Sequence, residues 1–349
     1  MNEEKNSPIT ASSPITRKKF LRVCGAIAAG GAVAAVSGTL MRRALTSPGG
    51  GAPSGSVAAA ADGLRRAQGE AFASPYRLVA AFATEQAVES LALRGDELYV
   101  AAANDVAAYD RYGTLLRRFA ADEPVRDMAV ADDGIYLLHP NRVSVYSPSG
   151  ERLRSWEACS DLSDYCSLAL AAGCVFATDV RNKNICKYTA EGNFVKFIDS
   201  PNGFVIPSYT FGIENVGGEL YCSNPGRHQV ERYTVEGEYL GAFGRRGVAP
   251  GMFTGCCNPV HLSCTPGGDV VTSEKGDPRI SCYGRDGAFR GVLLDGKMLG
   301  GGRIAYDVKV QGDKIVVAGK KRVAIFRYDS TRTANTACGG CGVSCPLRG

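Results

Sequence analysis

The chain has 349 residues, a formal net charge of +5 and a hydrophobic content of 45%. This composition is typical of a packed core and excludes a wholly disordered chain. The basic residues are scattered, with no basic run interleaved with aromatic residues, which argues against a nucleic-acid-binding surface.

The first segment, residues 1–46, combines a basic stretch with an Ala- and Gly-rich apolar stretch at 23–41. The basic stretch, "TRKKFLR", resembles a twin-arginine export signal, with Arg17 and Lys18 where that motif has two arginines. An ordinary secretory signal or a single uncleaved anchor helix is the alternative. We therefore expect an exported protein, periplasmic or extracytoplasmic, with 23–41 as a membrane tether if the signal is not cleaved. Residues 47–75, with "SPGGGAPSGS", predict a flexible linker.

From residue 76 onward, an apolar strand that ends in an aromatic residue is followed by a Gly-containing turn and a further strand, as in "VSVYSPSGERLRSW" and "VERYTVEGEYLGAF". The anchor aromatics are Tyr109, Tyr146, Tyr188, Tyr233, Tyr283 and Phe326. Their spacing runs from 37 residues (146 − 109) to 50 residues (283 − 233). Two more strands with alternating polarity precede each anchor. A period of roughly 40–50 residues with short strands predicts a β-propeller with six four-stranded blades over 76–330.

The last repeat lacks its fourth strand, while "SPYRLVAAF" at the start of the domain has that strand's pattern and no repeat of its own. We predict that residues 76–82 complete the sixth blade and close the ring. Closure of this kind removes the open sheet edges that a linear array would expose.

The repeats resemble the NHL family of six-bladed propellers, most clearly in "GMFTGCCNPVHLSCTPGGDVVTSEKGDPRISCYGRDGAFRG". The terminal repeats depart from that family, because Ala102 and Gly319 stand where it usually has Asp. The resemblance implies a module that binds a partner protein at one face of the propeller. The family also contains enzymes, so a propeller hydrolase, lactonase or lyase with an axial divalent metal is the alternative.

Two levels of polar residues are expected around the central channel. Aligning the repeats places Ser90, Asp127, Ser167, Gly212, His261 and Asp307 at the start of the inner strands. A second level contains His139, Asp179, Asn224 and Glu274. These side chains either bond neighbouring turns or, in the enzyme alternative, hold an axial ion such as calcium, which prefers oxygen ligands.

The tail, residues 331–349, contains Cys338, Cys341 and Cys345 in the spacing C-x2-C-x3-C-P. This spacing matches the last three cysteines of a ferredoxin-type cluster motif. An iron–sulfur cluster is one explanation of this spacing, with zinc as an alternative metal. The fourth ligand would then be Cys256 or Cys257, the first candidates, or Cys159, Cys166 or a residue of a partner protein. Such a cluster would make the protein an accessory of a membrane redox complex.

Disulfides or free thiols without any cofactor are the competing explanation for the cysteines. Without Cys24, twelve of the 13 cysteines remain, and an exported protein meets an oxidising compartment. Cys159 and Cys166 could close a loop, and Cys256 and Cys257 could pair with each other. Five other cysteines fall inside expected strands, where a thiol behaves as a small apolar residue: Cys174, Cys186, Cys222, Cys264 and Cys282.

Overall fold

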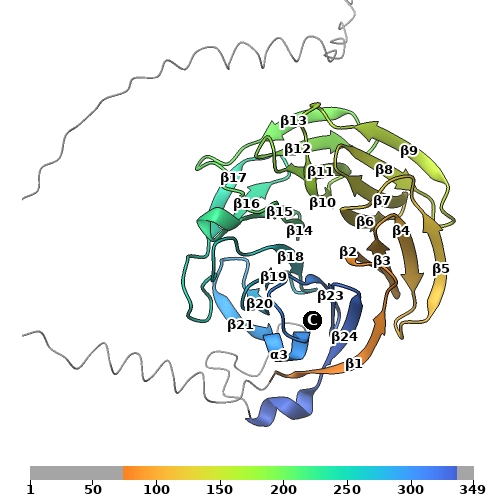
Figure 1. Cartoon of the computed structure of the whole chain (residues 1–349). Helices are drawn as coiled ribbons and strands as arrows, with labels where there is room; N and C mark the ends of the chain where they lie inside the picture. Colours follow the sequence, from red (N-terminus) through yellow and green to blue (C-terminus); the bar gives the residue numbers. More distant parts are fainter. Residues whose placement is uncertain (1–73, 336–349) are drawn as a thin grey trace, which may run out of the picture. The chain divides into compact units, whose positions relative to one another are not determined.

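The computed structural model describes residues 74–335 and contains six four-stranded antiparallel sheets arranged around one axis (Figure 1). The prediction of a six-bladed β-propeller is confirmed. The segments 1–46 and 47–73 and the cysteines of the tail lie outside the described residues. Among residues 74–335, no helix is long and apolar enough to cross a membrane.

Each blade runs from an innermost strand beside the axis to an outermost strand at the rim (Figure 1). The innermost strands are β2 (Val88–Arg94), β6 (Asp127–Ala131), β10 (Tyr165–Ala171), β14 (Ile213–Val216), β18 (His261–Cys264) and β22 (Asp307–Gln311). The second strands are β3 (Glu97–Ala102), β7 (Gly134–His139), β11 (Cys174–Asp179), β15 (Glu219–Asn224), β19 (Val270–Glu274) and β23 (Lys314–Gly319).

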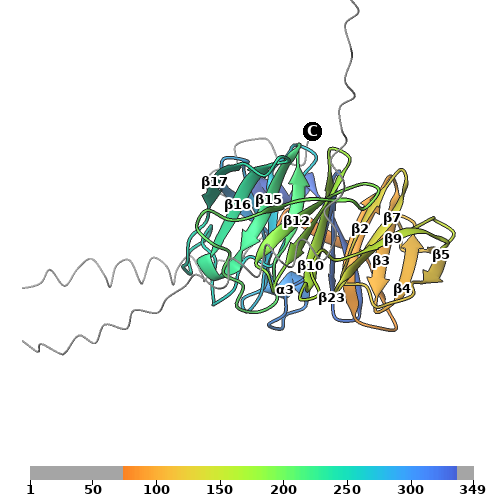
Figure 2. The same ribbon diagram turned by 90° about the horizontal axis from the view of Figure 1, so that it is seen from above.

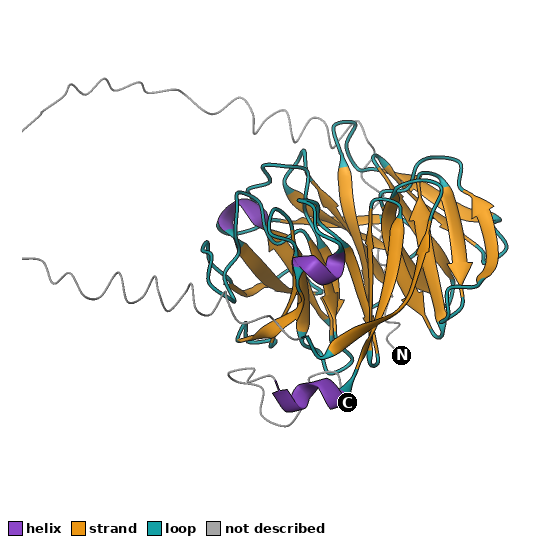
Figure 3. Cartoon of the chain, turned by 60° about the horizontal axis from the view of Figure 1, so that its bottom comes forward, coloured by secondary structure: helices purple, strands orange, loops and turns teal. Residues whose placement is uncertain are grey.

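The third strands carry the anchor aromatics predicted from the repeat. They are β4 (Asp105–Tyr109), β8 (Arg142–Tyr146), β12 (Asn184–Thr189), β16 (Gln229–Thr234), β20 (Arg279–Tyr283) and β24 (Arg322–Tyr328). The outermost strands are β5 (Leu115–Ala120), β9 (Arg152–Glu157), β13 (Phe194–Ile198), β17 (Tyr239–Phe243), β21 (Phe289–Leu294) and β1 (Tyr76–Ala83). Within residues 74–335, helix is confined to α3 (Gly296–Leu299) and the 3₁₀ segments η1 (Pro225–Arg227) and η2 (Ser330–Asn335), all outside the sheets (Figure 3).

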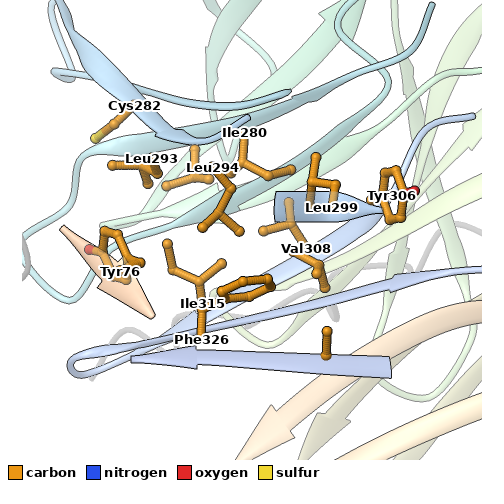
Figure 4. Packing of buried hydrophobic residues seen from close by; sticks show 13 residues of the cluster. Tyr76, Ile280, Cys282, Leu293, Leu294, Leu299, Tyr306, Val308, Ile315 and Phe326 are labelled. Atoms are coloured by element: carbon orange, nitrogen blue, oxygen red, sulfur yellow. The ribbon is translucent and has the colours of Figure 1, made fainter. Parts of the chain in front are cut away.

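The ring closes as predicted, because β1 pairs antiparallel with β24 as the outer strand of the sixth blade. Tyr76 lies opposite Tyr328, and Phe82 lies opposite Val323. The Tyr76 side chain is fully buried and packs between blades five and six with residues such as Leu293 and Phe326 (Figure 4). The first strand of the domain thus joins the last blade to the rest of the core.

The core consists of six apolar clusters, and each lies between two adjacent blades. Successive side chains of one strand point to opposite faces of the blade and pack into the two neighbouring clusters. On β3, for example, Leu98 and Val100 pack toward blade six, whereas Tyr99 and Ala101 pack toward blade two. Because each blade is covered on both faces, its second and third strands are largely buried on both sides, and the polar side chains on them are buried as well.

Strand direction alternates within a blade, as Figure 2 shows from the side. Consequently the loops between blades and the turns between second and third strands share one face of the disk, which we call the loop face. Hydrogen bonds join these loops and turns, for example Val125 N to Ala103 O at 2.8 Å and Tyr165 N to Pro140 O at 2.7 Å.

The glycine in each turn between third and fourth strands is needed for contact with the preceding blade. Gly192 has a φ of +92°, and a Cβ there would lie 2.5 Å from Cδ2 of Trp156 on β9. Gly150 approaches Phe119 on β5 equally closely. The repeated Gly is therefore required both by the turn and by the large apolar side chain of the preceding blade against which it packs.

We predict that Gly192→Ala lowers the free energy of unfolding by about 2–4 kcal/mol, because it adds a clash with Trp156 to the backbone strain. The matched control is Gly173→Ala in the same blade, where φ is +69° and a Cβ would meet no atom within 4 Å. That control should cost only about 1 kcal/mol. Chemical denaturation measures both values, and equal losses would contradict the packing role.

Candidate functional site

A ring of polar contacts links the blades where the innermost strands begin. Asp127 accepts a hydrogen bond at each carboxylate oxygen, from Ser90 Oγ of blade one and Ser167 Oγ of blade three, both at 2.7 Å. The backbone N–H of Leu168 also donates to Asp127. Ser167 Oγ in turn accepts from the backbone of Ile213 in blade four at 3.3 Å.

The ring continues through blade six. Asp307 accepts from the backbone N–H of Leu91 in blade one at 2.6 Å. His261 of blade five lies 3.7 Å from Asp307, measured from Nδ1 to Oδ1. Burial raises the pKa of Asp307, and the neighbouring Asp127 charge adds to that rise. The residues predicted to share one level of the channel are thus confirmed as neighbours around the axis.

One ion pair crosses the channel next to this ring. Lys309 Nζ on β22 lies 2.9 Å from Glu214 Oε2 on β14, and β18 stands between these two strands in the ring. About a fifth of each side chain is exposed to the channel. Burial alone would lower the pKa of Lys309, but the negative charges of Glu214, Asp307 and Asp127 outweigh it and hold that pKa above its usual range.

The second predicted level does not converge on the axis. Asp179 accepts hydrogen bonds from the backbone of Asp164, Arg181 and Asn182, within its own loop and turn. His139 Nδ1 contacts Pro124 O at 2.9 Å.

The other two residues of this level are also bonded locally. Asn224 bonds Val205 N, Gly203 O and Glu231. Glu274 is fully buried and paired with Arg279, 2.7 Å from its Nε. Within residues 74–335, no group of three or more His, Cys, Asp or Glu side chains is placed to hold a metal ion.

Cys256 and Cys257 lie side by side in the loop before β18, with their sulfur atoms 2.9 Å apart. Cys256 is exposed and Cys257 is buried. Burial alone would raise the pKa of the Cys257 thiol, but the contact with Cys256, supported by Ser208 and Lys275, lowers it. Lys275 also donates to Ser208 Oγ at 2.7 Å.

Cys338, Cys341 and Cys345 lie outside the described residues, which end at Asn335. β24 ends on the face opposite the loop face, and η2 follows beside the start of β1, with Arg332 donating to Tyr76 O. Cys338 comes three residues after Asn335 (338 − 335), a span of ~10 Å at most. One six-residue strand already spans ~20 Å. The assignment of Cys256 or Cys257 as fourth ligand stays a prediction, because a cluster and its cysteine side chains add to the reach of the chain.

One pair of cysteines was not predicted. Cys159 Sγ lies 3.5 Å from Cys186 Sγ, whereas Cys166, the suggested partner of Cys159, contacts Tyr209 O instead. Cys186 is buried on β12, as expected for a cysteine inside a predicted strand. No sequence signal showed that the preceding loop returns to that strand.

Solved structures to which this chain is similar include two lyases and a WD40 domain. One is a streptogramin B lyase, with 14% identity and a TM-score of 0.54 over 73% of this chain and 98% of that one. Another is a virginiamycin B lyase from Staphylococcus aureus, solved as a catalytically inactive His-to-Ala variant with quinupristin, with 13% identity and a TM-score of 0.53 over 72% and 99%. A third is the WD40 β-propeller domain of Doa1, with 10% identity and a TM-score of 0.53 over 74% and 98%.

These likenesses show the β-propeller fold. Neither a protein-family model nor a curated protein matches the chain. The NHL resemblance and the twin-arginine signal stay predictions.

The loop face carries a shallow groove between the turn that follows β11 and the loop that precedes β14. Its lining residues are Val180, Arg181, Lys183, Ile206 and Tyr209, and its volume is about 250 Å³. This is smaller than the roughly 300–1,000 Å³ of a typical small-molecule pocket. The groove combines apolar walls with two exposed cationic side chains.

Charge is distributed unevenly over the loop face. The loops and turns between 84 and 164 are mainly acidic, with Glu85, Asp122, Glu123, Asp161 and Asp164 against Arg126. Those between 180 and 321 are mainly basic, with Arg181, Lys183, Arg227, Arg245, Arg246, Lys275, Lys297, Arg303, Lys320 and Lys321 against Asp199, Asp277 and Asp295. The groove lies on the basic side.

We predict that Lys309→Met lowers the free energy of unfolding by about 2–4 kcal/mol, because it leaves the Glu214 carboxylate without its cation in the channel. Adding Glu214→Gln to this variant should restore part of the loss. Chemical denaturation of Lys309→Met, Glu214→Gln and the double variant measures the three free energies of unfolding, and their comparison with wild type gives the coupling energy of the pair. A Lys309→Met protein as stable as the wild type would show that the channel water already compensates both charges.

Proposed function

We propose that this chain is an exported or membrane-tethered propeller that binds a partner protein through the groove on its loop face. The observation that carries the proposal is the groove itself, with Ile206 and Tyr209 beside the cations Arg181 and Lys183. A groove of this chemistry fits a peptide segment that places an apolar side chain among acidic residues.

The surroundings of the groove support a protein partner. Large apolar side chains stand exposed on three neighbouring loops, with Leu162 75%, Tyr209 59% and Val248 72% accessible. The longest loops between blades are those that follow β13 and β17. The loop after β13 is fixed by two hydrogen bonds, from Lys275 to Ser208 Oγ and from Cys166 to Tyr209 O. WD40 domains such as that of Doa1 have the same type of scaffold.

The binding test uses a labelled acidic peptide that contains one central Leu, with its Asn- and Gln-substituted twin as the ligand control. Arg181→Glu with Lys183→Glu should weaken binding by roughly tenfold or more, on the order of 1–2 kcal/mol. The matched protein control is Lys320→Glu with Lys321→Glu, the corresponding turn of blade six on the same face. Affinity for the acidic peptide should fall as salt rises. Equal loss in both double variants, or equal binding of both peptides, would contradict the groove.

The proposal includes an iron–sulfur cluster on Cys338, Cys341 and Cys345, which suits an accessory of a membrane redox complex. Full-length protein purified without oxygen should contain iron and absorb visible light, and Cys338→Ser with Cys341→Ser should remove both. Cys256→Ser and Cys257→Ser test the fourth ligand, because the iron content should fall in the variant that removes it. Iron-free, colourless wild-type protein would remove the cluster, and a zinc content that depends on the same cysteines would replace it.

A lyase or hydrolase is the second candidate, favoured by His261 and Asp307 at the channel and by the lyases among the similar structures. Against it, Asp127 and Glu214 are already bonded within the ring. Turnover that requires a divalent cation and is lost in His261→Ala would favour the enzyme.

A further inference from the structure

We propose that Cys159 and Cys186 form a reversible dithiol–disulfide site in blade three, which fastens the loop at 158–164 to strand β12. Cys159 belongs to the loop that leaves β9, and Cys186 lies on β12. The site does not depend on the tail or on the proposed partner.

The geometry brings two thiols from separate elements into contact. Their sulfur atoms are 3.5 Å apart, so a small rotation of the side chains is enough for bond formation. Cys186 is fully buried, whereas Cys159 is partly exposed. A reagent from solvent therefore meets Cys159 first, and Cys186 is held ready to react with it.

Hydroxyl groups fix the loop beside the pair. The Tyr188 hydroxyl accepts a hydrogen bond from the backbone N–H of Cys159 at 3.1 Å and is itself bonded to the Tyr165 hydroxyl. Asn184 Oδ1 lies 3.8 Å from Cys186 Sγ. Polar groups thus surround the sulfur atoms on one side, and the apolar cluster between blades two and three covers the other.

The two thiols differ in acidity. The hydrogen bond from Cys186, supported by the hydroxyls of Tyr188 and Tyr165, lowers the pKa of Cys159 to about 7 against the effects of burial and the Asp179 charge. The same contact and burial raise the pKa of Cys186. Near neutral pH, Cys159 is the thiolate nucleophile and Cys186 the protonated partner.

The oxidant required is a low-molecular-weight disulfide. The Cys159 thiolate attacks one sulfur atom of it, a mixed disulfide forms, and one thiolate leaves and takes up a proton. Cys186 then loses its proton and attacks the Cys159 sulfur, which forms the Cys159–Cys186 bond and releases the second thiol. Two protein thiols are oxidised and one disulfide molecule is reduced to two thiols.

The bond would restrain a loop of the partner-binding face, because Leu162 is exposed on the same loop. It would also close a chain segment of 27 residues (186 − 159). Oxidation is therefore expected to raise the thermal midpoint of the full chain relative to the reduced protein.

Full-length protein is incubated with glutathione disulfide or with a phosphine reductant, then denatured, alkylated and mapped by mass spectrometry. We expect a peptide that links Cys159 to Cys186 in the oxidised sample only. In Cys159→Ser, Cys186 should be recovered as an alkylated thiol, whereas Cys166→Ser should leave the linked peptide unchanged. Recovery of both cysteines as alkylated thiols from oxidised wild type, or a link from Cys159 to any other cysteine, would overturn the proposal.

A second measurement needs no variant. The rate of Cys159 alkylation by iodoacetamide in the reduced wild type should rise with pH and reach half of its maximum at a pH of about 7. A half-maximum at the pH of an ordinary thiol, roughly 8.5, would remove the activated nucleophile from the mechanism.

Discussion

The pairing of β1 with β24 is the constraint on which the rest of this structure depends. Without it, blade six would end in an open strand edge, and the clusters that flank blade six would lose Tyr76 and Phe82. Because every cluster lies between two blades, a gap at one position leaves two apolar faces in water. Strand pairing at one point therefore stabilises packing around the whole circle.

The ring of contacts at the axis depends on the same closure. Asp307 of the last blade bonds Leu91 of the first, so this contact forms only when the two ends of the domain meet. Asp127 uses both carboxylate oxygens to join its neighbours, which places the negative charges where Lys309 can compensate them. The carboxylates of the channel are thereby engaged in contacts between blades, which is why our proposal places the partner on the loop face instead.

The repeat made the fold predictable from the sequence, including its unusual closure. Period-two strands, the anchor tyrosines and the turn glycines are local signals, and six copies reinforce each other. Gly192 illustrates the limit of such signals, since the pattern required a glycine but did not show that Trp156 of the preceding blade lies against it. The four residues of the second channel level were predicted at equivalent positions, yet equivalence in the repeat does not decide where each side chain points.

The repeat pattern could not predict side-chain contacts between different blades or between a loop and a strand. The Lys309–Glu214 pair depends on the width of the channel, and the Cys159–Cys186 contact depends on the path of a loop that belongs to no repeat. In both cases a departure from the repeat marks the place. No other innermost strand has a lysine at the position of Lys309, and Cys186 stands two residues before its anchor tyrosine, where the other third strands have Ala, Ser or Glu. In a repeat protein the shared residues build the scaffold, so the residues that differ between copies are where function should be sought.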